Sequence, residues 1–343
     1  MESRESHGGL TPVAHSAIVA TEVDGRSHAS LVELTDEDLP EGDVTITVHY
    51  SSLNYKDGLA VTGTGRIVRS FPLVCGIDLA GTVERSDSPL WKAGDEVVLT
   101  GWGLSETHPG GYTQRQRVRS QWLVPKPDGL TLLQSMAMGT AGLTAMLCVL
   151  ALEHGGLAPD ADAGDVLVTG AAGGVGSVAV ALLAALGYTV AASTGRAETH
   201  DFLRSLGATT MVDRQDLATP SGKPLDRERF AAAVDVVGGE TLASILRQTR
   251  YRGTVAACGL TGGNDLPTTV LPFILRGVTL AGVDSVSCPT DVRTGAWHRL
   301  GQDLPRKLLD SLTTVEPLRR VPELAQDIVA GRTRGRVVID VNA

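Results

Sequence analysis

Apolar and polar residues alternate along the first third of the chain, in short stretches separated by turns. Residues 44–50 (Val-Thr-Ile-Thr-Val-His-Tyr) show the two-residue period of a half-buried strand. Residues 16–34 alternate more loosely around Asp24-Gly25, a pair typical of hairpin turns. Further short strands with glycine-rich loops follow as far as residue 125. This spacing predicts an all-β, barrel-like domain.

The pattern changes near Gly129, where helical stretches begin to alternate with short apolar strands. Residues 132–152, rich in Ala, Leu and Met, predict two helices that meet near 139–142. Buried strands alternating with helices are typical of a doubly wound parallel sheet. The expected strands of this sheet are 165–169, 189–194, 210–213, 231–237, 253–260 and 277–284. A final segment, with a helix at 304–312 and a strand at 336–341, is expected to return to the first domain.

A glycine-rich turn, Gly170-Ala-Ala-Gly173-Gly174-Val-Gly176, separates a buried strand from the helix expected at 177–186. The missing side chains let backbone approach a pyrophosphate, which would bind the unpaired N–H groups at the helix N-terminus. Glycine-rich turns also serve plain packing, so the pattern alone leaves both interpretations open. If the turn binds a dinucleotide, we expect its contacts to come from Ala172, Gly173, Gly174 and Val175.

The end of the following strand, Thr194-Gly195-Arg196, indicates which dinucleotide would bind. An acidic residue at this place hydrogen-bonds the adenosine ribose hydroxyls in NAD-binding proteins and would repel a 2′-phosphate. A hydroxyl, a backbone N–H and a guanidinium can instead bind that phosphate. The sequence therefore predicts NADPH, and the alternative is that Arg196 is a solvated surface charge.

Composition limits the classes of partner. A chain of 343 residues is too long for one simple core, so two domains are expected. The net charge of −9 argues against nucleic acid as a bulk electrostatic partner, and the apolar stretches are expected to fall short of a membrane span. Residues 1–15 are polar, show no signal-peptide pattern and predict a disordered leader. The expected location is the cytoplasm.

Cysteine spacing gives no sign of a metal centre. The four cysteines lie far apart, and no pair has zinc-finger or Cys-x-x-Cys spacing. We therefore expect no metal, and expect Cys75, Cys148, Cys258 and Cys288 to behave as small buried apolar residues.

Several strings along the chain resemble one known family. They are Ser51-Ser-Leu-Asn-Tyr-Lys-Asp57, Leu99-Thr-Gly-Trp-Gly103, Gly139-Thr-Ala-Gly142, Val255-Ala-Ala-Cys-Gly-Leu260 and Gly282-Val-Asp-Ser-Val286. On these strings, residues 16–342 resemble the medium-chain dehydrogenase/reductase superfamily and, within it, the YhdH/AcuI group of NADPH-dependent acryloyl-CoA reductases. The resemblance implies an α/β protein with a GroES-like β-barrel domain at 16–130 and 286–343. It also implies a doubly wound Rossmann domain for NADPH at 131–285.

The chain departs from the zinc enzymes of that superfamily. These place a catalytic zinc on a Cys, on the His of a Gly-His-Glu motif and on a later Cys, whereas this chain reads Gly76-Ile77-Asp78. The structural-zinc lobe with four cysteines is also missing. The resemblance therefore implies a zinc-independent reductase, in which hydrogen bonds polarise the substrate carbonyl.

The activity implied by the resemblance is reduction of the double bond of acryloyl-CoA to propanoyl-CoA. Asn54 and Tyr55 are the candidate catalytic residues, and Tyr55 is also a candidate cofactor contact. The alternatives are that Tyr55 only contacts the cofactor, that Asn54 only caps the turn, and that water supplies the proton. The resemblance further implies cofactor contacts at the nicotinamide side or the adenine end from Thr140, Arg214, Leu260, Ile274 and Ser285.

Further expectations concern partners. Five arginines are candidates for the phosphates of coenzyme A, although a run of charges is usually a solvated face. They are Arg66, Arg69, Arg115, Arg117 and Arg119. Residues 277–283 look like an edge strand, which relatives use to pair two subunits, so a homodimer is expected. Two other functions stay open: an NADPH-dependent quinone or general enone reductase, and an NADPH-binding protein with a sensing or structural role and negligible turnover.

Overall fold

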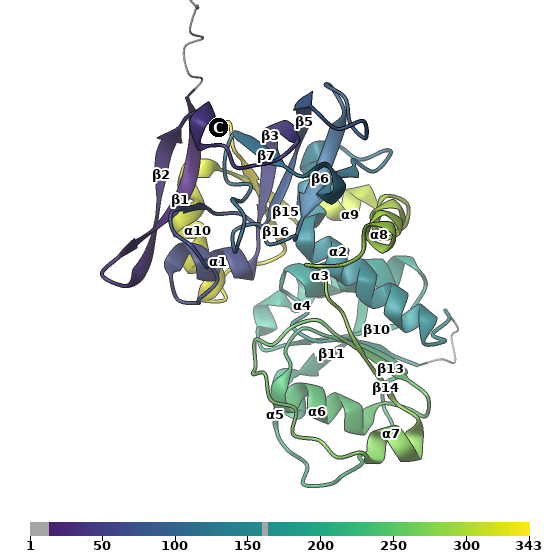
Figure 1. Cartoon of the computed structure of the whole chain (residues 1–343). Coiled ribbons are helices and arrows are strands. Elements are labelled where there is room, and N and C mark those ends of the chain that lie inside the picture. Colours follow the sequence, from purple (N-terminus) through teal and green to yellow (C-terminus); the bar gives the residue numbers. More distant parts are fainter. Residues whose placement is uncertain (1–13, 160–163) are drawn as a thin grey trace, which may run out of the picture.

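The computed structural model describes residues 14–159 and 164–343, which form two bodies joined by helices and a crossover segment (Figure 1). The disordered leader predicted at 1–15 lies outside the described residues except for Ala14 and His15. His15 already begins strand β1 (His15–Val23).

A hairpin opens the chain, as the alternating pattern predicted. Strand β1 pairs antiparallel with β2 (Arg26–Leu34), and its other edge pairs with β4 (Leu73–Val74). The turn residues Asp24 and Gly25 have φ values of 50° and 72°. Both lie in the left-handed region, which hairpin turns of two residues require. The Asp24-Gly25 prediction is therefore confirmed.

A seven-stranded sheet forms the rest of the first body. Its strands run in the order β15-β16-β3-β5-β6-β8, and β7 also pairs with β3. Strand β16 near the C-terminus pairs antiparallel with β3, so the end of the chain lies in the same sheet as the early strands. The strands are β3 (Val44–Leu53), β5 (Asp78–Ser86), β6 (Glu96–Thr100), β7 (Arg115–Val118), β8 (Val124–Pro125), β15 (Thr313–Pro317) and β16 (Arg336–Asp340).

The second body contains a six-stranded sheet in which every pairing is parallel. Its order, β11-β10-β9-β12-β13-β14, proceeds in opposite directions from β9, which is the arrangement of a doubly wound sheet. The predicted α/β fold class is confirmed. The strands are β9 (Val166–Val168), β10 (Val190–Thr194), β11 (Ala208–Asp213), β12 (Ala232–Asp235), β13 (Thr254–Ala257) and β14 (Thr279–Gly282).

Strand β14 corrects one expectation and confirms another. Residues 277–284 were expected to be a buried strand, yet β14 is partly exposed because only β13 pairs with it. The separate expectation that this strand lies at the sheet edge is confirmed. The exposed edge results from topology, which the apolar composition of the segment does not reveal.

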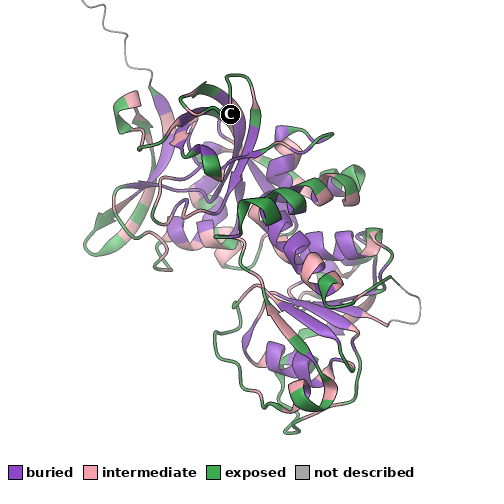
Figure 2. Ribbon diagram, turned by 45° about the vertical axis from the view of Figure 1, so that its right-hand side comes forward, coloured by how far each residue is buried: buried purple, intermediate pink, exposed green. Residues whose placement is uncertain are grey.

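Helix α2 (Leu132–His154) packs between the two bodies, against α3 (Gly174–Ala185) and α8 (Thr290–Asp303) and against strands β3 and β5. Gly139 interrupts it with φ 53° and ψ −153°, so the predicted meeting of two helices is confirmed. The helix is long and apolar enough to cross a membrane, which corrects the expectation from the sequence. Most of it is nevertheless buried in the fold (Figure 2), as in a core helix.

The remaining helices cover the sheets. Helix α8 was not predicted, because Gly295, Gly301 and several polar residues obscure its buried face of Arg293, Ala296, Trp297 and Leu300. The helix expected at 304–312 is α9 (Arg306–Ser311). The others are α1 (Tyr55–Thr62), α4 (His200–Ser205), α5 (Arg214–Ala218), α6 (Gly239–Gln248), α7 (Leu271–Arg276) and α10 (Val321–Val329).

Candidate active site

The carboxyl edge of the parallel sheet gathers most of the predicted cofactor residues. The glycine-rich turn follows β9, Thr194 ends β10, and Arg214 directly follows β11. Leu260 and Ser285 lie in the segments that leave β13 and β14 at the same edge. Ligands of doubly wound proteins bind at this edge, near the point where the strand order reverses. The topology therefore agrees with the cofactor site predicted from the sequence.

The glycine-rich turn forms a cradle at the start of α3. Gly173 is the N-cap, and the backbone bonding of the helix begins with Ser177 N donating to Gly173 O at 2.9 Å. The N–H groups of the first turn, at Gly174 and Val175, therefore have no partner within the helix. A Cβ at Gly176 would lie 2.4 Å from Gly170 O, so only glycine allows this close packing of helix on strand. The cradle fits the pyrophosphate of a dinucleotide.

Two guanidinium groups flank the end of β10. Arg214 covers Gly195 so closely that a Cβ there would lie 2.4 Å from Arg214 Nε. Arg196 Nη1 donates to the carbonyl oxygens of Gly331 (2.8 Å) and Thr333 (3.3 Å), in the segment that leads to β16. These two cations fit the 2′-phosphate of NADPH, which carries negative charge at this place.

A buried polar cluster lies where β3, α1, β5 and α2 meet. Asp78 is fully buried, and its Oδ2 accepts hydrogen bonds from Ser52 Oγ (2.5 Å) and from the backbone N–H of Thr140 (2.9 Å). Its Oδ1 accepts from Thr140 Oγ1 at 2.5 Å. The carboxylate therefore joins the first body to the kink of α2, since Thr140 directly follows Gly139.

Asn54 and Tyr55 differ in what their side chains are free to do. Asn54 is buried, and its Nδ2 donates to Asp78 Oδ2 (2.9 Å), Asp57 Oδ2 (3.1 Å) and Ser52 Oγ (3.1 Å). Tyr55 begins α1 and is 44% exposed. Of the two candidate catalytic residues, Tyr55 is accessible to a substrate, whereas the Asn54 amide is engaged within the protein. This geometry favours the alternative that Asn54 has a structural role.

Asp57 adds a second buried carboxylate to the cluster. It accepts from the backbone N–H groups of Asn54 (2.9 Å) and Ile77 (2.8 Å). Complete burial and the neighbouring charge of Asp78 raise the pKa of Asp57 to about 7. The structural role expected for Asp57 agrees with these contacts, because they fix the start of α1 beneath Tyr55.

Thr140 is linked to Ser285 through one further side chain. The Thr144 hydroxyl forms hydrogen bonds with the Thr140 carbonyl oxygen (2.7 Å) and with Ser285 Oγ (2.8 Å). Two of the predicted cofactor residues, Thr140 and Ser285, are thereby brought together across α2 and the segment after β14.

Arg336 is a site residue that the sequence analysis did not single out. Its side chain is buried, and Nε donates to Ala137 O at 2.7 Å, while Nη2 finds no hydrogen-bond partner among residues 14–159 and 164–343. A Cβ at Gly174 would lie 2.8 Å from Arg336 Nη1, so the guanidinium lies directly beside the glycine-rich turn. The signal in the sequence is a cation directly before the apolar run Val337-Val338-Ile339 of β16.

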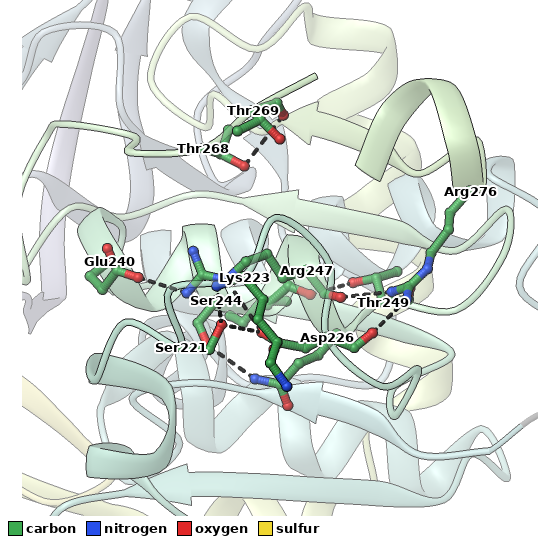
Figure 3. A network of polar contacts seen from close by, with 12 residues as sticks. Ser221, Lys223, Asp226, Glu240, Ser244, Arg247, Thr249, Thr268, Thr269 and Arg276 are labelled. Atoms are coloured by element: carbon green, nitrogen blue, oxygen red, sulfur yellow. Dashed lines mark hydrogen bonds and ion pairs between the residues drawn. The ribbon is translucent and has the colours of Figure 1, made fainter. Parts of the chain in front are cut away.

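Leu260 and Ile274 are placed differently from each other. Both side chains are 67% exposed. Leu260 follows β13 at the carboxyl edge, but Ile274 lies on α7, whose Arg276 donates to the carbonyl oxygens of Arg247 and Thr249 at the far end of α6 (Figure 3). The described chain by itself does not bring Ile274 beside the glycine-rich turn, so this contact stays a prediction.

A hollow of about 640 Å³ also lies at that far edge of the sheet. Polar side chains of the 216–229 segment, α6 and Arg250 line it, among them Lys223, Asp226 and Ser244. None of the predicted site residues belongs to its lining.

The candidate arginines for coenzyme A divide into two groups. Arg115 forms ion pairs with Asp36 and Glu84, Arg117 Nε lies 3.5 Å from Thr45 Oγ1, and Arg119 lies over the Trp122 ring. Arg66 and Arg69 are exposed on the loop after α1, where the Arg69 side chain forms a 3.7 Å ion pair with Glu106 and its backbone N–H donates to Glu106 O at 2.9 Å. Of the five candidates, Arg66 and Arg69 are therefore the two exposed arginines on the loop that follows α1.

A catalytic zinc does not fit the residues at this site. Ile77 is apolar and buried where a zinc-binding imidazole would stand, and burial raises the pKa of the Cys75 thiol to about 12, which disfavours the thiolate that binds zinc. Within residues 14–159 and 164–343, no three His, Cys, Asp or Glu side chains are grouped as metal ligands.

Comparison with known proteins agrees with this architecture. Residues 40–128 match the alcohol dehydrogenase GroES-like domain, and residues 174–301 match the zinc-binding dehydrogenase domain. The acrylyl-CoA reductase AcuI of Ruegeria pomeroyi is 53% identical over 322 residues, which cover 94% of this chain and 97% of that protein.

Two solved structures are similar along almost their whole length. The YhdH oxidoreductase of Salmonella enterica in complex with NADP is 50% identical, with a TM-score of 0.93 over 95% of this chain and 99% of that one. The Bacillus subtilis protein YhfP with NAD bound is 45% identical, with a TM-score of 0.92 over 96% and 100%. The chain therefore belongs to the medium-chain dehydrogenase/reductase superfamily and, within it, to the group of AcuI and YhdH.

Proposed function

We propose that this protein reduces the double bond of acryloyl-CoA with NADPH and releases propanoyl-CoA. The observation that carries the proposal is the position of the exposed Tyr55 beside the Asp78 cluster, which reaches the glycine-rich turn through Thr140 and Arg336. The identity of 53% with an acrylyl-CoA reductase over nearly the whole chain supports the same substrate.

We assign the residues that would hold NADPH from the sequence prediction and from their places at the carboxyl edge of the sheet. The first turn of α3, with Ala172, Gly173, Gly174 and Val175, faces the pyrophosphate. Thr194, Gly195, Arg196 and Arg214 hold the adenosine end and its 2′-phosphate. Thr140, Leu260 and Ser285 would border the nicotinamide, and Ile274 stays a contact that only the family resemblance predicts. When bound, NADPH supplies the hydride that reaches the β-carbon of the acyl group.

Side chains of the protein would stabilise the negative charge that develops on the substrate and supply the proton that completes the reduction. Negative charge develops on the thioester oxygen during the reduction, and the Tyr55 hydroxyl donates a hydrogen bond to it. A proton from Tyr55, or from water that Tyr55 orients, then completes the bond at the α-carbon. Asn54 acts indirectly, because its amide fixes Asp57 and Asp78 beneath the start of α1.

Coenzyme A is proposed to extend over the loop after α1. Arg66 and Arg69 are exposed there, while Arg115 is engaged by two carboxylates. Arg69 has one ion pair, with Glu106 at 3.7 Å, and a guanidinium with fewer and longer carboxylate contacts can bind a phosphate at a smaller loss of existing interactions. We therefore assign the phosphates of coenzyme A to Arg66 and Arg69.

Assembly and location belong to the same proposal. Among the described strands, only β13 pairs with β14, and pairing of two such free edges would extend the sheet across a homodimer. We propose a homodimer located in the cytoplasm. In each subunit, residues 16–130 and 286–343 would form the GroES-like catalytic domain, and residues 131–285 would form the Rossmann domain that binds NADPH. Sedimentation equilibrium of the wild type checks the dimer, and a monomer at micromolar concentration contradicts it.

The first test is the loss of NADPH absorbance with acryloyl-CoA, crotonyl-CoA and a simple quinone offered in parallel. Fast oxidation with acryloyl-CoA supports the proposed reaction. Oxidation by the quinone or by free enones alone favours the second function, a general quinone or enone reductase. Tight NADPH binding without oxidation by any acceptor favours a sensing or structural role.

A further inference from the structure

Helix α8 brings a fully buried guanidinium to the junction of the two bodies. Arg293 Nη1 donates to the carbonyl oxygen (2.8 Å) and hydroxyl (2.9 Å) of Thr100, the last residue of β6. Its Nη2 donates to the carbonyl oxygens of Ser285 (3.1 Å), Val286 (3.1 Å) and Cys288 (3.3 Å). One side chain thus ties the seven-stranded sheet to the crossover segment, residues 283–289, which rises from β14 to α8 (Figure 1).

The crossover segment is also held tightly against the loop after β6. The backbone N–H of Trp102 donates to Val286 O at 3.0 Å, and Arg293 lies 5.1 Å from the centroid of the Trp102 ring. Gly101 has φ 76°, and a Cβ on it would lie 2.7 Å from Val286 O. Only a glycine permits this approach of the two backbones, and Arg293 satisfies the carbonyl groups that the approach buries.

The same segment carries Ser285, which reaches the candidate active site. Ser285 Oγ lies 2.8 Å from the Thr144 hydroxyl, which is bound to Thr140 O, and Thr140 in turn binds Asp78. A displacement of the crossover segment would therefore move Ser285 at the nicotinamide side and loosen the fixed position of Thr140.

We infer that Arg293 is a positioning residue, which sets the crossover segment, and with it Ser285, against the cofactor site. This inference rests on the proposed function, because Ser285 is assigned there to the nicotinamide. A planar guanidinium can bind Thr100 and three crossover carbonyl oxygens at once, whereas the single ammonium of lysine cannot span both groups. A displacement of about 1 Å at a reacting centre can cost up to roughly 100-fold in rate.

The test compares Arg293→Lys with Arg247→Lys. Arg247 is also buried and binds two carboxylates, Asp226 and Glu240, but it lies at the far edge of the parallel sheet (Figure 3). Both variants lose bonds of a buried guanidinium, so both should lower the unfolding midpoint. Well below that midpoint, Arg293→Lys is expected to reduce kcat and to raise the Kd of NADPH, each by about tenfold or more, while Arg247→Lys leaves both unchanged.

Two outcomes overturn the inference: wild-type kcat and Kd in folded Arg293→Lys, or equal losses in both variants. Should Arg293→Lys fail to fold, Thr100→Val removes one acceptor of Arg293 and keeps the buried volume. It is expected to move kcat in the same direction by about threefold, and no change contradicts the assignment. The Kd of NADPH, measured by its fluorescence, needs no acceptor. If the wild-type protein binds no NADPH, the proposed function is contradicted. If the variants keep the wild-type kcat and Kd of NADPH, only the role of Arg293 is contradicted.

Discussion

The side-chain amide of Asn54 donates a 2.9 Å hydrogen bond to the fully buried carboxylate of Asp78. The same nitrogen lies 3.1 Å from Asp57 Oδ2, so one amide serves two buried acids. Buried carboxylates that lose a donor have no water to replace it. Asn54 therefore connects the turn that presents Tyr55 with the residues that fix the kink of α2.

Replacing Asn54 with alanine should destabilise the protein markedly. We expect Asn54→Ala to lower the free energy of unfolding by about 2–4 kcal/mol, because two buried carboxylates lose a shared donor. Urea denaturation measures this change. Asn342→Ala is the control: that amide donates to Val48 O near the exposed C-terminus, and its loss should cost less than about 1 kcal/mol. An equal loss in the free energy of unfolding for the two variants would contradict the structural role assigned to the Asn54 amide.

Tyr55→Phe tests the accessible hydroxyl. If Tyr55 donates to the thioester oxygen or supplies the proton, kcat should fall by about 100-fold while the Kd of NADPH changes little. The phenyl ring keeps the packing of α1, so stability should be unaltered. Tyr251→Phe, at a residue 66% exposed and remote from α1, serves as the control. An unchanged kcat in Tyr55→Phe would remove Tyr55 as an essential proton donor.

Reversing the charge of Arg196 should separate the two nicotinamide cofactors. Arg196→Glu places a carboxylate beside the expected 2′-phosphate, so the KM for NADPH should rise by about 10- to 100-fold while that for NADH changes much less. Arg204→Glu, on the neighbouring helix α4, reverses an exposed arginine that forms an ion pair with Asp201, and it should leave the ratio of the two KM values unchanged. An equal change of both constants in Arg196→Glu would refute the assignment to the 2′-phosphate.

The buried carboxyl of Asp57 should make stability depend on pH. Burial and the charge of Asp78 raise its pKa from 3.8 to about 7, so the folded chain holds a proton that the unfolded chain releases. Between about pH 4 and 7 the free energy of unfolding therefore falls as the pH rises, by up to about 1.4 kcal/mol per pH unit from this group.

Asp57→Asn cannot ionise and should remove this contribution from the slope between about pH 4 and 7. Denaturation by urea at several pH values provides the measurement. The control Asp201→Asn changes an exposed carboxylate and should keep the wild-type slope. A wild-type slope in Asp57→Asn would mean that Asp57 stays ionised in the folded protein.

The sequence was sufficient wherever neighbouring residues determine the structure. The Asp24-Gly25 hairpin, the strand, turn and helix around Gly173, and the kink at Gly139 all depend on contacts within a few residues. Such local preferences are visible as patterns of apolar residues and glycines. These local patterns also predict the order of strands and helices, and that order is typical of a doubly wound sheet.

Only the tertiary structure determined which polar groups meet. Thr140 binds Asp78 across 62 residues, Arg336 binds Ala137 across 199, and Arg293 binds Thr100 across 193. No local preference encodes these contacts, because each joins two elements that are far apart in the sequence: α2 with β5, β16 with α2, and α8 with β6. The exposure of β14, the engagement of Arg115 and the buried amide of Asn54 depend in the same way on which neighbours the completed fold supplies.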